Sequence, residues 1–169
     1  MVSFNSCSPT YRLGFLGFDF TVSKPSLADY ELVKKSDSEV DILVVAIHWG
    51  TEYKKDPNSF QRDWAKEFVE NGADIISGTH PHWVQGIDCI IGESWQYVGR
   101  EAVDEFLQTN HCEKIVFYSL GNLVFDQMWS EETKKGILAE LTVTTGKLYR
   151  IKTHKIYIEK IGQPIIIEK

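Results

Sequence analysis

An unbroken apolar run from Asp41 to Ile47 (DILVVAI) is the feature that most restricts the fold of this chain. A β-branched run without polar alternation is typical of a strand that is covered on both faces. A second buried strand is predicted over Ala73–Ser77. Between the two strands an amphipathic helix is predicted, with its apolar face formed by Phe60, Trp64, Phe68 and Val69. Strands that alternate with such helices predict right-handed βαβ units and a largely parallel sheet, which is an α/β fold.

Local signals mark where the predicted helices begin and end. Ser26 has the spacing of a capping box, so a helix is predicted from Leu27 to about Lys35, after a strand over Tyr11–Phe20. Asn58 is the predicted N-cap of the second helix. The pair Asn71-Gly72 is its predicted C-terminal stop, because glycine adopts the left-handed conformation that ends many helices.

Beyond residue 83 the pattern changes from repeated strand-helix units to a mixed order. The predicted elements are a strand, a helix, a strand and an antiparallel hairpin with one solvated face: Val84–Ile91, a helix within Gly99–Asn110, Ile115–Leu120, and two strands from Gly136 that turn at Gly146. No repeat or linker divides the chain. We therefore expect a disordered segment over residues 1–10 and one domain over residues 11–169.

Composition narrows the classes of function. The formal net charge of −6 argues against a general nucleic-acid or membrane-surface binder, because such proteins need basic patches to neutralise phosphates. It leaves an anionic substrate open, since a bound metal ion can reverse the local field. No apolar run approaches the roughly 20 residues of a membrane span. Residues 1–10 lack the basic start and apolar core of a signal peptide.

The three cysteines, Cys7, Cys89 and Cys112, are odd in number and lie far apart, without a CxxC pair. This spacing gives no support to a zinc ribbon or a thioredoxin-type site. We interpret them as small thiols, either buried or on the surface. Three cysteines leave the redox compartment open.

Three histidines and an asparagine stand just beyond the ends of predicted strands. His48 follows the first buried strand, His80 and His82 follow the second with one proline between them, and Asn122 follows a third. Ligands of parallel sheets bind beyond the carboxyl ends of the strands, so these side chains are predicted to converge if the strands are neighbours. Imidazole suits zinc, iron, nickel and manganese, and three nitrogens with an open position leave room for an activated water.

Each of these residues also has a purely structural interpretation. A lone histidine such as His48 is more often a hydrogen-bonded turn residue than a ligand. The pair His80 and His82 is more specific, because the proline between them stiffens the turn. Asn122 alone fits a simple Gly-Asn turn. Glu52 fits either an exposed loop carboxylate or a group that supports a histidine or relays a proton.

The candidate site has few carboxylates. A dinuclear hydrolytic site needs bridging carboxylates to hold two ions about 3.5–4 Å apart, and only Asp19 stands at a comparable strand end. Three basic residues fit either attraction of an anion near the site or a solvated face: Lys54, Lys55 and Arg62. Three tryptophans are interpreted as packing residues: Trp49, Trp64 and Trp83. Two further histidines are assigned no role: His111 and His154.

Three motifs in order resemble a known family. HWGTEY at His48–Tyr53, GADIISGTHPHWVQG at Gly72–Gly86 and YSLGNLVFDQ at Tyr118–Gln127 are similar to the bacterial capsule-synthesis CapA family, which is associated with poly-γ-glutamate synthesis. Further matches are Pro57, Gln61 and Gln163-Pro164. The similarity runs from about residue 11 to the C-terminus.

The resemblance implies a calcineurin-like metallophosphoesterase fold, an α/β/β/α sandwich of mixed sheets flanked by helices. It implies that His48, His80 and His82 bind a divalent metal ion, which we expect to be manganese, iron or zinc. Glu52 and Asn122 match the acidic residue and the asparagine of the family's motifs, and they are the expected catalytic residues. Glu52 would support a ligand or relay a proton, and Asn122 would orient substrate or water.

The family's N-terminal half, with its early aspartate and its asparagine or histidine motifs, has no counterpart in this sequence. The segment Gly92–Glu113 is also longer than the strand connection that the resemblance implies. We therefore expect a partial domain, whose sheet and site could be completed by a partner chain.

The resulting hypothesis is a protein of capsule or poly-γ-glutamate biosynthesis with a metal-dependent, phosphoesterase-like site. There a bound hydroxide would attack a phosphorus or carbonyl centre of an anionic or polymeric substrate. The alternatives are a non-catalytic accessory component of a polymer synthesis or export assembly, and an inactive truncated fragment. The resemblance suggests the cell envelope as the location.

Overall fold

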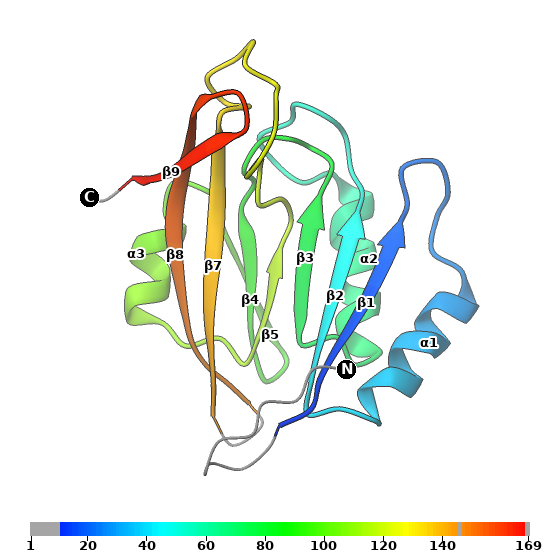
Figure 1. Cartoon of the computed structure of the whole chain (residues 1–169). Coiled ribbons are helices and arrows are strands. Elements are labelled where there is room, and N and C mark those ends of the chain that lie inside the picture. The colour runs from blue at the N-terminus through cyan, green and yellow to red at the C-terminus, as the bar shows by residue number, and fades with distance from the viewer. Residues whose placement is uncertain (1–10, 145–146, 168–169) are drawn as a thin grey trace.

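The computed structural model describes residues 11–144 and 147–167, and a six-stranded mixed sheet forms its centre (Figure 1). The strand order is β1-β2-β3-β6-β4-β5. The strands are β1 (Leu13–Asp19), β2 (Ile42–His48), β3 (Ile75–Thr79), β4 (Ile87–Ile91), β5 (Ser94–Val98) and β6 (Lys114–Phe117). The first three strands and β6 run parallel, as predicted, whereas β4 and β5 are antiparallel.

A second, antiparallel sheet contains β7 (Lys135–Thr144), β8 (Lys147–Lys160) and β9 (Gln163–Ile167). The helices are α1 (Leu27–Asp37), α2 (Ser59–Glu70) and α3 (Val103–Thr109), and α3 lies beside β8 (Figure 1). The fold is therefore α/β, as predicted. No helix in the described part of the chain is both long and apolar enough to cross a membrane.

The local signals for the first two helices are confirmed. Ser26 caps α1 in a capping box with Asp29, and Asn58 caps α2 in a capping box with Gln61. Each box satisfies backbone N–H groups that have no partner within the helix. The predicted stop after α2 is also present, since Gly72 has a φ of +117°.

Some predicted boundaries were wrong. The segment Gly92–Glu113 contains a strand that was not predicted, β5, which pairs with β4 before α3 begins. Strand β4 begins at Ile87 rather than at Val84. The prediction of two strands after Gly136 did not include β9, which pairs with β8 as a third strand. The predicted disordered segment over residues 1–10 and the predicted turn at Gly146 lie outside the described residues.

The apolar face predicted for α2 is correct except at its start. Phe60 is 62% exposed, whereas Gln61 is fully buried. The amide of Gln61 caps the helix and also donates to the side chain of Gln85 at 3.1 Å. A buried polar residue is tolerated there because its hydrogen bonds are made within the protein.

A disulfide joins Cys89 and Cys112, so the interpretation of these two residues as thiols was wrong. Cys89 lies on β4 and Cys112 lies just before β6. Because β4 and β6 are neighbours in the sheet, the two Cα atoms are 5.3 Å apart despite a sequence separation of 23 residues. Cys7 lies outside the described residues.

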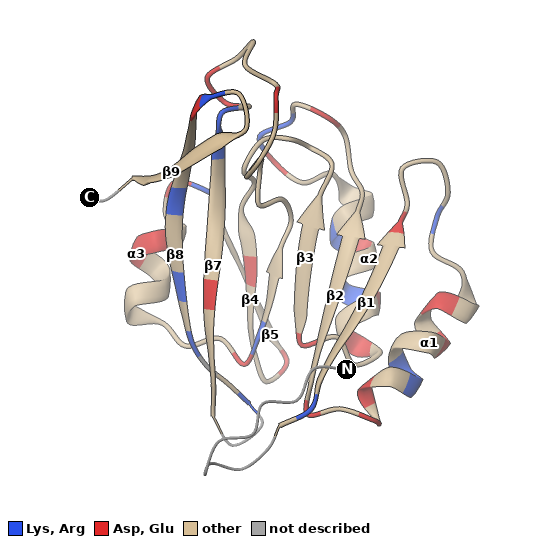
Figure 2. Ribbon diagram, in the orientation of Figure 1, with Lys and Arg blue, Asp and Glu red and all other residues tan. Residues whose placement is uncertain are grey.

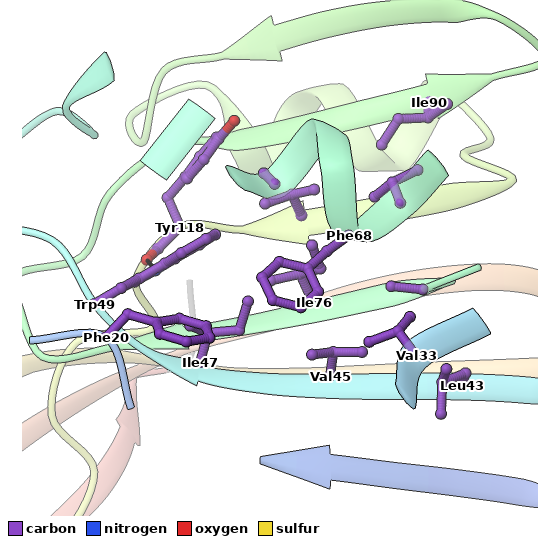
Figure 3. Packing of buried hydrophobic residues seen from close by; sticks show 14 residues of the cluster. Phe20, Val33, Leu43, Val45, Ile47, Trp49, Phe68, Ile76, Ile90 and Tyr118 are labelled. Carbon is purple, nitrogen blue, oxygen red and sulfur yellow. Dashed lines mark hydrogen bonds between the residues drawn. The ribbon is translucent and has the colours of Figure 1, made fainter. Parts of the chain in front are cut away.

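The core lies on both faces of the six-stranded sheet. On one face the helices α1 and α2 bury side chains of β2 and β3, as Figure 3 shows for Val33, Leu43, Val45, Phe68 and Ile76. On the other face Val103 of α3 and Leu148 and Ile151 of β8 belong to one buried cluster with Ile42, Ile75 and Ile115 of the six-stranded sheet. Part of this second face stays open over β1 and β2, where Phe15 is 63% exposed and Ala46 is also exposed. The prediction that the run Asp41–Ile47 is covered on both faces is therefore only partly correct.

Replacing Cys89 and Cys112 together by serine is expected to lower the free energy of unfolding by about 3 kcal/mol, because the disulfide restricts the unfolded chain. Urea denaturation followed by tryptophan fluorescence measures the change. A reductant should bring the parent protein to the stability of the double variant and leave the variant unaltered. Equal stability of parent and variant under oxidising conditions would contradict this expectation.

Candidate functional site

The structure brings the three histidines together at one edge of the sheet. The carboxyl ends of β1, β2 and β3 are in register, with Asp19 opposite His48 and His48 opposite Thr79. His80 follows Thr79, and its ring centroid lies 4.8 Å from that of His48. The ring of His82 lies 6.4 Å from that of His80. We call this set of His48, His80 and His82 the histidine edge.

Gly78 allows the next strand to approach this edge. A Cβ atom at Gly78 would lie 2.1 Å from the backbone oxygen of Tyr118, so no side chain fits there. The N–H of Leu120 donates to the oxygen of Gly78 at 3.1 Å. The segment that carries Asn122 therefore runs directly beside the segment that carries His80.

The backbone at this edge is held in an unfavourable conformation. Among the described residues, three that are not glycine have a positive φ: Tyr53 at 59°, His80 at 94° and His82 at 60°. Such conformations cost on the order of 1–3 kcal/mol each and persist only where the surrounding structure imposes them. The N–H of Tyr53 donates to the oxygen of Pro81 at 2.8 Å, which ties the two strained loops together.

Asn122 determines the tautomer of His82. Its amide Nδ2 donates to the backbone oxygen of Thr133 at 2.8 Å, which leaves Oδ1 to accept from Nδ1 of His82 at 2.9 Å. A neutral His82 therefore carries its proton on Nδ1 and presents the lone pair of Nε2. Asn122 is buried, so water does not compete for this hydrogen bond.

Thr79 acts on His48 in the same way. The hydroxyl of Thr79 donates to the backbone oxygen of Ile47 at 3.3 Å and can accept from Nδ1 of His48 at 3.0 Å. The free nitrogen of a neutral His48 is again Nε2. Two of the three histidines thus have the tautomer in which Nε2 can bind a metal ion, fixed by the hydrogen bond at the other nitrogen.

Burial, followed by the charge of His48, lowers the pKa of His80 below the ordinary value for histidine. Glu52 and Asp19 act in the opposite direction but do not reverse the shift. His80 is therefore neutral at pH 7, which is the form of histidine that binds metals.

Two carboxylates lie at the histidine edge. Oε1 of Glu52 is 3.8 Å from Nε2 of His82, and the side chain of Glu52 is 46% exposed. Asp19 accepts hydrogen bonds from the backbone N–H and the hydroxyl of Thr21 at 2.9 and 2.7 Å. These bonds lower the pKa of Asp19, with smaller contributions from His48 and His80.

The donor set suits a divalent metal ion chemically, and its spacing fits in part. Two histidines on one tetrahedral ion, with metal–nitrogen distances of about 2.1 Å, have ring centroids roughly 5 Å apart. The 4.8 Å between His48 and His80 fits this spacing, whereas the 6.4 Å between His80 and His82 is wider. Within residues 11–144 and 147–167, no group of three or more His, Cys, Asp or Glu side chains is arranged to hold an ion. His82 must turn towards the other two histidines to share one metal.

Trp49 and His154 make structural contacts. Trp49 is fully buried and its indole Nε1 donates to the backbone oxygen of Tyr118 at 2.9 Å, so its interpretation as a packing residue is confirmed (Figure 3). His154 pairs with Glu140 in the second sheet at 2.8 Å.

Two of the three basic residues that could attract an anion, Lys55 and Arg62, make contacts with other groups. Lys55 forms an ion pair with Glu101 at 2.9 Å, and the guanidinium group of Arg62 lies 4.1 Å from the centre of the Tyr97 ring. Figure 2 shows both acidic and basic residues on the loops that follow β1 and β2, so this edge carries no field of a single sign.

The sequence did not reveal the aromatic residues around His82. The ring of Tyr53 stacks on His82 at 5.8 Å and meets Trp129 edge to face at 4.8 Å. Phe125 lies 5.0 Å from His82. Tyr53 and Phe125 belong to the motifs around His48 and Asn122, which is a signal that could have identified them. Nothing in the sequence pattern marks Trp129.

Comparisons with known proteins identify relatives of this region. The family model described as bacterial capsule synthesis protein PGA_cap matches residues 23–127. The chain is 37% identical over 99 residues to the PGA biosynthesis protein CapA of Bacillus subtilis (strain 168), and 39% identical over 100 residues to the capsule biosynthesis protein CapA of Bacillus anthracis. Both alignments cover 59% of this chain but only 20% and 19% of the relatives, so the chain spans about a fifth of their length.

The two tautomers can be tested by nitrogen-15 NMR of the histidine rings at a pH above the usual histidine pKa of about 6.5. His48 and His82 are expected to show a protonated Nδ1 and an unprotonated Nε2. Asn122→Ala should shift His82 towards the other tautomer and leave His48 unchanged, and Thr79→Val should do the reverse. An Nε2-protonated His82 in the parent protein would contradict the hydrogen-bond assignment.

Proposed function

This chain belongs to the bacterial capsule synthesis PGA_cap family, and from this premise we propose that its histidine edge is part of a metal-dependent hydrolase site. The observation that carries the proposal is the pair of hydrogen bonds that occupy Nδ1 of His48 and Nδ1 of His82 and leave Nε2 of each ring available to a metal ion, next to His80. Hydrogen bonds that fix the second nitrogen of a histidine are typical of metal ligands.

His48, His80 and His82 would hold a divalent ion, with manganese, iron or zinc as the expected metals. Such an ion would polarise a phosphoryl or acyl oxygen as a Lewis acid and stabilise the negative charge that develops there. Asp19 lies opposite His48 and is the nearest ionised carboxylate on the neighbouring strand, so it is a further candidate ligand.

Glu52 is proposed to move a proton. Its carboxylate is half exposed and 3.8 Å from His82, so it can accept a proton from an attacking water without entering the metal's own donor set. Asn122 is proposed as a positioning residue: its side chain is buried, and its amide is committed to His82 and Thr133.

The proposal extends to the fold and to the cellular role. The mixed central sheet with helices on one face and a second sheet on the other supports a metallophosphoesterase-like sandwich. The open face over β1 and β2 is where a partner chain could complete both the sandwich and the site. Because two relatives are named for PGA and capsule biosynthesis, we place the reaction in the synthesis of such a polymer, with an anionic or polymeric substrate.

A second candidate function is a non-catalytic accessory component of polymer synthesis. The observation that favours it is that the described residues contain no group of three or more ligands arranged around one ion. In that case the histidine edge would serve as a binding surface only.

The test is the metal content of the purified chain after incubation with Mn²⁺ or Zn²⁺ and dialysis, measured by elemental mass spectrometry. The parent protein should retain metal, and His80→Ala/His82→Ala should bind it at least about tenfold more weakly, because it lacks two of the proposed ligands. His154→Ala is the matched control, since His154 pairs with Glu140 away from the histidine edge.

Hydrolysis of bis-(p-nitrophenyl) phosphate separates the two candidate functions. Turnover in the parent that is lost in His80→Ala/His82→Ala supports the hydrolase. Metal retention without turnover supports the accessory role. A parent protein that retains no metal contradicts the proposed metal site.

A further inference from the structure

Strand β1 forms one edge of the six-stranded sheet, and the proposed hydrolysis does not use that edge. Among the described strands, β1 pairs only with β2. The backbone oxygen of Arg12 accepts from the N–H of Asp41, and the N–H of Phe20 donates to β2, each at 2.8 Å. The even-numbered residues of this segment therefore face β2. Because successive residues of a strand point in opposite directions, the N–H and C=O groups of its odd-numbered residues face outward, where no described strand lies.

The β1 edge lacks the features that keep other sheet edges from pairing. Edge strands are usually protected by charges, proline, bulges or short length. In the described sheets β5 is short and carries the polar Ser94 and Gln96, and β9 contains Pro164. Strand β7 carries charged residues and a bulge. Strand β1 has a single charged residue, at its end, and pairs with β2 without a register shift, so its edge is open to another strand.

Exposed apolar residues gather at this edge. Phe15 on β1 is 63% exposed, and an added Cβ at Gly17 would meet no atom within 4 Å. Three exposed aliphatic residues lie nearby, after β1 and on α1, which lies beside β1 (Figure 1): Val22, Leu27 and Leu32. A gathering of exposed apolar residues of this kind is typical of an interaction surface.

The sequence of β1 is complementary to itself when two copies run antiparallel. With Leu16 opposite Leu16 of a second copy, Phe15 lies opposite Gly17 of that copy. Both residues belong to the odd-numbered set, so they would exchange backbone hydrogen bonds. The ring of Phe15 would cover the open space over Gly17, a cross-strand pairing of ring and glycine that stabilises antiparallel strands. A two-fold axis makes this contact twice.

The charges at the two ends of β1 are complementary in the same arrangement. Arg12 precedes the strand, Asp19 ends it, and both residues are exposed. Arg12 pairs only loosely with Asp41, at 3.7 Å. Antiparallel pairing puts the start of one strand beside the end of the other, so each Arg12 would lie beside the strand end that carries Asp19 of the other copy. A second copy of the chain thus matches both the apolar and the charged parts of this edge.

From these observations we propose that two copies of this chain pair through β1 as an antiparallel, two-fold symmetric dimer, which joins their six-stranded sheets into one. The axis is perpendicular to the sheet, so both α1 helices lie on the same face, and their exposed leucines widen the interface. The two histidine edges lie at opposite ends of the paired strands, because each lies at the carboxyl end of its own β1. The dimer does not depend on the proposed metal site.

The test is sedimentation-velocity centrifugation of the whole chain over a range of concentrations, in buffer that contains a chelator. The parent is expected to form a species of twice the chain mass. Phe15→Asp should raise the dimer dissociation constant at least about tenfold, because it removes two ring–glycine contacts and puts a carboxylate diagonally opposite Asp19 of the other copy. Because Phe15 is largely exposed, this variant should remain folded, which circular dichroism verifies.

Ile166→Asp is the matched control, since Ile166 is an exposed apolar residue on β9, at the edge of the other sheet. It should dimerise as the parent does. A monomeric parent, equal dimerisation by Phe15→Asp, or loss of the dimer in Ile166→Asp would overturn the proposal. Because no metal is added, failure of the dimer is distinguishable from failure of the proposed hydrolase site.

The register is tested by cysteine cross-linking in a Cys7→Ser background. Leu16→Cys should form a disulfide between copies on oxidation, because the axis places the two Cα atoms about 4.5 Å apart. Phe18→Cys is the control, since its two copies would lie about 13 Å apart along the strands. Absence of a cross-link in Leu16→Cys, or an equal cross-link in Phe18→Cys, would overturn the proposed pairing.

Discussion

The close contact between Gly78 and Tyr118 is the constraint on which the histidine edge depends. The backbone oxygen of Tyr118 occupies the space where any side chain at position 78 would lie. The same oxygen accepts the indole N–H of Trp49 from the end of β2. One carbonyl group thus fixes the ends of β2, β3 and β6 relative to one another. The histidines that follow β2 and β3 and the asparagine that follows β6 meet because these strand ends meet.

The parts of the fold that could be predicted from the sequence are those with local causes. Capping boxes and apolar runs lie within a few residues of the elements they determine, so α1, α2 and the parallel strands were found. Strand β5 was missed because its exposed edge carries polar residues such as Ser94 and Gln96, which show no buried pattern. The disulfide was missed because Cys89 and Cys112 become neighbours only through the pairing of β4 with β6.

The same distinction applies to the candidate site. The rule that parallel sheets bind ligands at the carboxyl ends of their strands was enough to bring His48, His80 and His82 to one edge. It could not show which nitrogen of each ring is free. That depends on Thr79, and on the amide of Asn122, whose second partner, Thr133, lies 11 residues further along the loop between β6 and β7. Which nitrogen of a histidine can bind a ligand depends on the hydrogen bond at the other nitrogen. The partner in that hydrogen bond is set by the tertiary structure.

The strand order has a consequence for the order of assembly. Strand β6 lies between β3 and β4, although it follows both of them and β5 in the chain. A chain that has not yet reached Phe117 therefore lacks the strand that joins its two halves. Contacts between residues far apart in sequence form slowly, because the loop between them must close first. The tautomer of His82 is thus fixed late, because a nascent chain that ends before Asn122 carries this imidazole without the group that determines which of its nitrogens is free.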